Sequence, residues 1–160
     1  MNHKIIPHEN AGKALNPQRK IGIFDFPFTL NMNIGCFYAC NYCYVKDSHA
    51  KWKMTFGEEM KVKLWLPKKL DIELGKYREL PQHLKRVQIN NSTEGLHPKT
   101  MKYVQEHYNR DIMTEMLEVF GRHWDIGNRW MVHFVTKSNS IVNYVGILTE
   151  LKRMVQVEIT

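Results

Sequence analysis

The chain has 160 residues, which is long enough for one domain with its own hydrophobic core. Hydrophobic residues make up 43% of it and charged residues 24%, a balance that argues against a disordered chain. No apolar run approaches the roughly 20 residues of a membrane span, and the start, MNHKIIPHEN, lacks the apolar core of a secretory signal. We therefore expect a cytoplasmic protein in a reducing compartment, with no membrane partner.

The formal net charge is +7, and much of the excess is a group of lysines that follows the cysteines discussed below. A solvated lysine-rich face is the simplest interpretation, because charge alone carries no specificity. A surface for nucleic acid or another polyanion is the alternative, although the interleaved aromatic residues of a single-strand stacking platform are missing. The lysines in question are Lys46, Lys51, Lys53, Lys61, Lys63, Lys68 and Lys69.

The first half of the chain predicts a lead-in, a strand and a helix. Residues 1–26 are expected to form an irregular polar lead-in, since prolines and glycines recur in it (Pro7, Gly12, Pro17 and Gly22). The run FTLNMNI (28–34) predicts a strand that ends at Gly35, and KVKLW (61–65) predicts an extended segment. Pro67 suits the first turn of a helix, with Leu70, Leu74 and Tyr77 on one face.

The second half alternates strands and helices. We expect strands over 86–90, 130–136 and 155–160, a helix over 111–123 capped by Asp111 or Asn109, and a helix over 140–151. Residues 27–160 should then form an α/β domain with about four parallel strands, either an open sheet or a partial (β/α) barrel. The polar loops fall after the strands, at the edge where such folds gather their chemistry.

The three cysteines, Cys36, Cys40 and Cys43, lie within eight residues in a C-x3-C-x2-C spacing. An odd number packed so closely makes a poor disulfide framework, and the spacing favours a metal site. Three thiolates can hold three irons of a four-iron cluster and leave the fourth iron free to bind a small chelating ligand. The alternative is a zinc site, with His49 as the fourth ligand.

The segment GCFYACNYCY (35–44) resembles the signature loop of the radical S-adenosylmethionine (SAM) superfamily. The resemblance implies a partial (β/α) barrel in which the three cysteines bind a [4Fe–4S] cluster whose open iron chelates SAM. It also implies that an external reductant supplies one electron, and that SAM is cleaved to a 5′-deoxyadenosyl radical that abstracts hydrogen from a substrate. Tyr42 is expected beside the adenine.

Further matches resemble the branch that includes spore photoproduct lyase. They are Asn91-Ser92-Thr93-Glu94, Thr136-Lys137-Ser138 and the terminal VQVEIT. The resemblance implies that Asn91, Ser92 and Glu94 lie near the methionyl amino group of SAM, that Lys137 and Ser138 lie near its carboxylate, and that Glu158 and Thr160 reach its ribose. The alternative roles are a polar turn for Asn91, Ser92 and Glu94, a surface lysine for Lys137, and a helix cap for Ser138.

Two features limit what the resemblance implies. The lyase is expected to have a further, hydrogen-donating cysteine, and this chain has only the three of the motif, which speaks against thymine-dimer repair. Closed barrels need about 250 residues, so we expect the chain to be the amino-terminal part of a longer enzyme. Two other hypotheses stay open: a zinc-containing nucleic-acid-binding module, and an inactive remnant of a radical SAM enzyme. No catalytic residue or substrate is predicted.

Overall fold

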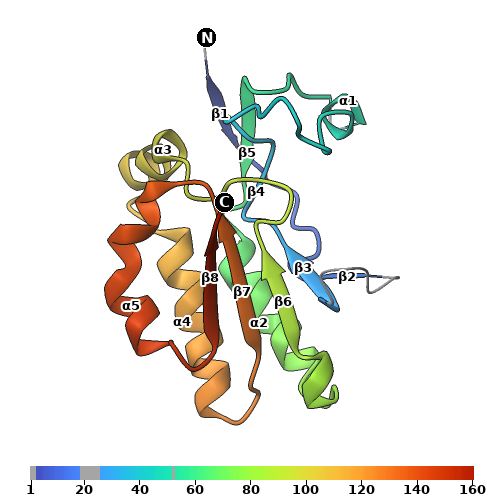
Figure 1. The fold of residues 1–160 in the computed structure, drawn as a ribbon, viewed down its shortest axis with the longest axis vertical. Coiled ribbons are helices and arrows are strands. Elements are labelled where there is room, and N and C mark those ends of the chain that lie inside the picture. The colour runs from blue at the N-terminus through green and yellow to red at the C-terminus, as the bar shows by residue number, and fades with distance from the viewer. Residues whose placement is uncertain (1–2, 19–25, 52) are drawn as a thin grey trace.

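The computed structural model describes residues 3–18, 26–51 and 53–160, and its fold is mixed α/β (Figure 1). Two sheets, one of five strands and one of three, are flanked by helices. In chain order the elements are β1 (Lys4–Pro7), β2 (Asn16–Pro17), β3 (Phe28–Leu30), β4 (Asn33–Ile34), α1 (Ser48–Lys51), β5 (Glu59–Val62), α2 (Leu66–Lys76), η1 (Gln82–Leu84), β6 (Arg86–Ile89), α3 (Pro98–Tyr108), α4 (Ile112–Asp125), β7 (Met131–Thr136), η2 (Asn139–Tyr144), α5 (Val145–Glu150) and β8 (Val155–Ile159).

The larger sheet has the strand order β2-β3-β6-β7-β8. The last four of these strands run parallel, as predicted, while β2 adds an antiparallel edge. Helices α2, α4 and α5 lie along one face of this sheet (Figure 1). The parallel direction brings the carboxyl ends of β3, β6, β7 and β8 to one edge, and that edge carries the candidate site.

Alternating strand residues build the core between the sheet and the helices. Val87 and Ile89 on β6 and Val132 and Phe134 on β7 are buried against that face. The helices supply the opposite side of the core from positions at helical spacing. These are Leu70 and Leu74 on α2 and Met113, Met116, Leu117 and Phe120 on α4.

Helix α4 begins where the sequence predicts. The Asp111 carboxylate accepts hydrogen bonds from the backbone N–H of Met113 (3.1 Å) and Thr114 (3.2 Å), which satisfies two donors that a helix start leaves open. Asn109, the other predicted cap, instead ends α3 in a left-handed conformation. The Asp111 side chain thereby fixes the helix that covers the centre of the sheet.

The predicted irregular lead-in over 1–26 is wrong in two places. β1 pairs in parallel with β5, and β2 pairs with β3, so both segments gain strand partners that are distant in sequence. Pairing of this kind leaves no local periodicity by which it can be predicted. Residues 19–25, which include Gly22, lie outside the described part of the chain.

The single strand predicted over 28–34 is also wrong, because it divides into β3 and β4, which belong to different sheets. The Asn31 side chain lies at the break and bonds to Ser92 in the loop after β6 (Nδ2–Oγ 2.9 Å), so the chain leaves the larger sheet there. β4 then pairs antiparallel with β5.

Two helices differ from the prediction. The helix expected over 140–151 is a 3₁₀ segment (η2) followed by the short α5, because the Ser138 hydroxyl caps a tight first turn through Ser140 N (3.2 Å). α3 has no sequence prediction, since only Thr100 and Val104 are buried on an otherwise polar helix. Among the described helices none has the length and apolar composition needed to cross a membrane.

Candidate functional site

Three loops meet at the carboxyl edge of the parallel strands. They are the cysteine loop after β4, the loop that follows β6, and the residues directly after β7; the chain's last residue lies at the same edge (Figure 1). Together they enclose a cavity of about 210 Å³. Its wall includes nine of the eleven residues predicted for the site, namely Cys36, Cys40, Cys43, Tyr42, Asn91, Ser92, Glu94, Lys137 and Thr160.

The cysteine loop begins at a position that requires glycine. Gly35 has φ +88°, and a Cβ there would lie 2.5 Å from the carbonyl oxygen of Glu59 and 2.9 Å from Met54. The loop then closes a turn in which Cys43 N donates to Cys40 O (3.0 Å). This geometry keeps the loop short and brings its cysteines to the cavity wall.

All three cysteines are unpaired and partly buried. Burial raises the pKa of the Cys36 thiol, while backbone hydrogen bonds from Tyr38 and Glu94 oppose that rise. The hydrogen bond from Glu94 matters structurally, because it joins the cysteine loop to the loop after β6. Cys36 therefore lies where the two loops touch.

The thiols do not form a preassembled metal centre. Within residues 3–18, 26–51 and 53–160, no three His, Cys, Asp or Glu side chains already lie in position to hold a metal ion. The side chain of His49, the fourth ligand in the zinc alternative, lies outside the described residues. A [4Fe–4S] cluster nevertheless fits the donor set, since three thiols from one loop face one cavity and metal binding commonly draws such ligands together.

Lys137 connects the end of β7 to the cysteine loop. Its ammonium group donates to the hydroxyl of Tyr42 and to Cys40, and lies 4.4 Å from the centroid of the Tyr42 ring. The hydrogen bond to Tyr42 raises the pKa of Lys137. Lys137 is itself exposed, as the alternative of a surface lysine at the end of a strand predicts.

Glu94 is buried at the base of the cavity, with 4% of its surface exposed. Its carboxylate accepts hydrogen bonds from Thr136 Oγ1 (3.0 Å), Lys137 N (2.7 Å) and Leu96 N (2.9 Å). The carboxylate thus ties the loop after β6 to the end of β7. Sequence reasoning missed this role, although Thr136 stands within the matched Thr-Lys-Ser segment.

Asn91 and Ser92 are held from the opposite side of the cavity. Tyr44 of the cysteine loop donates its hydroxyl to Asn91 O (2.8 Å), and Asn31 bonds to Ser92 through its amide nitrogen and oxygen. Sequence reasoning named neither Tyr44 nor Asn31. The polar residue in the middle of FTLNMNI was the one signal for Asn31.

Two predicted residues, Ser138 and Glu158, lie outside the cavity wall. Ser138 is fully buried, and its hydroxyl donates to Leu96 O (2.7 Å) and accepts from Ser140 N, which is the predicted helix-cap alternative. Glu158 instead pairs with His133 (3.1 Å) on the strand beside it. Thr160 lies past the end of β8, its backbone N–H donates to Thr136 O (3.0 Å), and of the two residues expected at the ribose it is the one that lines the cavity.

Comparisons of the chain with protein-family models, with curated proteins and with solved structures give no match in any of the three. The cavity itself is therefore the feature of this chain that indicates a function. Its wall brings together three thiols, one ammonium group, three exposed tyrosines and the 90–94 loop at the carboxyl edge of a parallel sheet.

Proposed function

We propose that this chain is a radical SAM protein of the spore photoproduct lyase-like branch, in which Cys36, Cys40 and Cys43 hold a [4Fe–4S] cluster and SAM occupies the cavity beside them. The observation that carries the proposal is the convergence of all three thiols, Lys137 and the 90–94 loop on one cavity. Four parallel strands with helices on one face are consistent with part of a (β/α) barrel.

A bound cluster and SAM would supply the redox chemistry, namely one-electron cleavage of the sulfonium of SAM that leads to hydrogen abstraction from a substrate. The side chains of the cavity wall bind SAM and orient it. Lys137 offers a cation to the SAM carboxylate, and the Tyr42 ring, 77% exposed, offers an aromatic face to the adenine. Thr160 stands in the wall for a ribose contact. An external reductant and a reducing, cytoplasmic compartment complete the proposal.

Anaerobic incubation with iron and sulfide is the direct test. We expect the wild-type chain to bind both in about equal amounts, because its three thiols face one cavity. Cys36→Ala, Cys40→Ala and Cys43→Ala should each abolish this uptake. Tyr38→Phe is the matched control, because it changes the same loop but no thiol, and it should bind as much iron as the wild type. The reduced, loaded chain should convert added SAM to 5′-deoxyadenosine, measured by chromatography. Stoichiometric zinc with no iron uptake would contradict the proposal and favour the zinc-containing module.

Lys137→Met should separate binding of SAM from binding of the cluster. The variant removes the ammonium group proposed to meet the SAM carboxylate but leaves the three thiols in place. A charge-assisted hydrogen bond contributes about 1.5–3 kcal/mol, so SAM should bind at least about tenfold more weakly while iron content stays unchanged. Equilibrium dialysis with labelled SAM measures the first quantity and iron analysis the second. Unchanged SAM affinity would remove Lys137 from the proposed pocket.

A further inference from the structure

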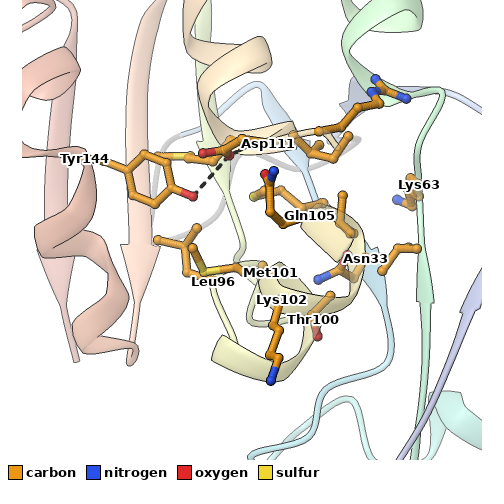
Figure 2. A pocket seen from close by; sticks show the side chains of 16 residues that line it. Asn33, Lys63, Leu96, Thr100, Met101, Lys102, Gln105, Asp111 and Tyr144 are labelled. Atoms are coloured by element: carbon orange, nitrogen blue, oxygen red, sulfur yellow. Dashed lines mark hydrogen bonds between the residues drawn. The ribbon is translucent and has the colours of Figure 1, made fainter. Parts of the chain in front are cut away.

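A second cavity, of about 260 Å³, lies away from the cysteines, between α3, the start of α4 and the β4–β5 pair (Figure 2). Its volume is slightly below the roughly 300 Å³ at which pockets for drug-sized ligands begin, so it suits a small molecule. Much of its wall is apolar and includes the side chains of Met32, Val62, Leu96, Met101, Val104 and Met113.

Lys63 gives this apolar wall a positive charge. Its ammonium group donates to Asn31 O (2.7 Å) and lies 5.9 Å from the centroid of the Trp65 ring. No carboxylate among the described residues lies within ion-pair distance of it. Burial lowers the pKa of Lys63 to about 8. Lys63 is half-buried, and an ammonium group withdrawn from water without a counter-charge is costly to desolvate.

The other charges near the cavity already have partners. Arg110 forms a two-point pair with Glu115 (Nε–Oε1 2.9 Å and Nη2–Oε2 2.5 Å). Asp111 caps α4 and accepts the hydroxyl of Tyr144 (3.1 Å), the bond drawn as a dashed line in Figure 2. Among the described lining residues, Lys63 is therefore the cation with spare capacity for an anion.

Lys102 makes an internal comparison, because it also lines the cavity. It has its own counter-charge, Glu106, one helical turn along α3 (3.6 Å), and its side chain points away from the cavity in Figure 2. Two lysines thus flank the same space, and they differ in whether a carboxylate of the chain is already beside them.

We propose that this cavity binds a small amphipathic carboxylate, with its carboxylate on the Lys63 ammonium group and its hydrocarbon body against the methionines and aliphatic side chains. A single available ammonium group matches a single negative charge. A phosphate would need more donors than Lys63 alone provides. The apolar wall adds binding energy in proportion to the hydrocarbon area that it covers.

Methionine methyl groups report occupation directly. In the 160-residue chain labelled with ¹³C at the methionine methyls, hexanoate should shift the signals of Met32, Met101 and Met113, which line the cavity, and leave those of Met54 and Met131 unmoved. Hexanol, which is neutral and of similar size, should move the same three signals with at least about tenfold weaker affinity, because it cannot pair with the ammonium group. Absence of saturable shifts, or shifts spread equally over Met54 and Met131, would overturn the proposal.

Two variants separate charge pairing from general packing. Lys63→Met should weaken hexanoate binding at least about tenfold and leave hexanol binding within about twofold, whereas Lys102→Met should leave hexanoate binding within about twofold. Thermal melts of both variants verify that each is folded. Equal hexanoate affinity in wild type and Lys63→Met would contradict the assignment. The titration needs neither SAM nor a cluster, so its outcome is independent of the proposed radical SAM function.

Discussion

Glu94→Ala is expected to destabilise the fold by about 2–4 kcal/mol, because it leaves three buried donors without an acceptor. The donors are the hydroxyl of Thr136 and the backbone N–H groups of Lys137 and Leu96. Partial entry of water through the neighbouring cavity keeps the cost below the sum of three lost hydrogen bonds. Urea unfolding followed by circular dichroism measures the difference in unfolding free energy.

Glu94→Gln and Glu118→Ala are the matched variants. The amide introduced by Glu94→Gln would keep one acceptor but place an N–H against a donor, so this variant should lose roughly half as much stability as Glu94→Ala. Glu118 is an exposed glutamate on α4, and its removal should change stability by less than about 0.5 kcal/mol. A cost below about 1 kcal/mol for Glu94→Ala would show that its hydrogen bonds do not hold the two loops together.

Glu94→Ala should also impair the cavity, for a reason separate from global stability. The same carboxylate orders the 94–96 loop against the end of β7, and backbone groups of that region contact Cys36. Loosening the loop should slow iron uptake even where the variant is fully folded. The rate of anaerobic iron incorporation, measured well below the unfolding temperature, tests this directly.

Local patterns were sufficient for the parallel strands and for α4. The alternation in 86–90 and 130–136 places Val87, Ile89, Val132 and Phe134 on one face, and a period of two is typical of strands in segments this short. The Asp111 cap is equally local, since its acceptor and donors lie within three residues. The cysteine loop reaches the carboxyl edge less directly, because the chain passes from β3 into β4 of the smaller sheet before the loop begins.

The elements that the sequence did not predict depend on distant partners. β1 has a strand identity only because β5 lies beside it, and β4 leaves the run of 28–34 because Asn31 bonds to Ser92, 61 residues away. Glu73 shows the same effect on a helix. It is buried because its carboxylate accepts the N–H groups of Ala14 (3.1 Å) and Leu15 (2.8 Å), which helical periodicity does not indicate.

The candidate site likewise has features that depend on local sequence and features that depend on distant partners. Its cysteines follow from spacing within one loop, whereas the geometry around Glu94 and Glu158 depends on which strands meet. Side chains on one strand face were expected to act together, but Glu158 lies within reach of His133 on β7 and Thr160 lies beyond the last strand residue. The sequence pattern predicts which edge of the sheet carries the candidate site. The packing of the strands decides which side chains at that edge are free to bind a ligand.

Trp130→Ala is expected to cost about 3–5 kcal/mol, the range for removing a fully buried aromatic side chain. Trp130 has no exposed surface and packs against Phe28 and Tyr77, with ring centroids 5.3 Å and 6.3 Å away. Its position is just before β7, at the amino edge of the sheet, opposite the cysteine loop. Urea unfolding measures the loss, and Trp130→Phe should lose less than about 1.5 kcal/mol because most of the ring packing is kept.

The indole nitrogen sharpens this comparison. It is buried without a hydrogen-bond partner among the described residues, so its replacement in Trp130→Phe removes an unsatisfied donor and offsets part of the lost volume. A loss for Trp130→Phe as large as that for Trp130→Ala would contradict this account.

Trp130→Ala and Glu94→Ala together test whether stability and binding reside at opposite edges of one sheet. Both variants should unfold at lower urea concentration, but only Glu94→Ala removes bonds that order the cavity wall. At a temperature where both are folded, Trp130→Ala should incorporate iron at the wild-type rate and Glu94→Ala should not. Equal slowing of iron incorporation in both variants would mean that the cysteine loop responds to overall stability, and the carboxyl edge would then have no separate organisation.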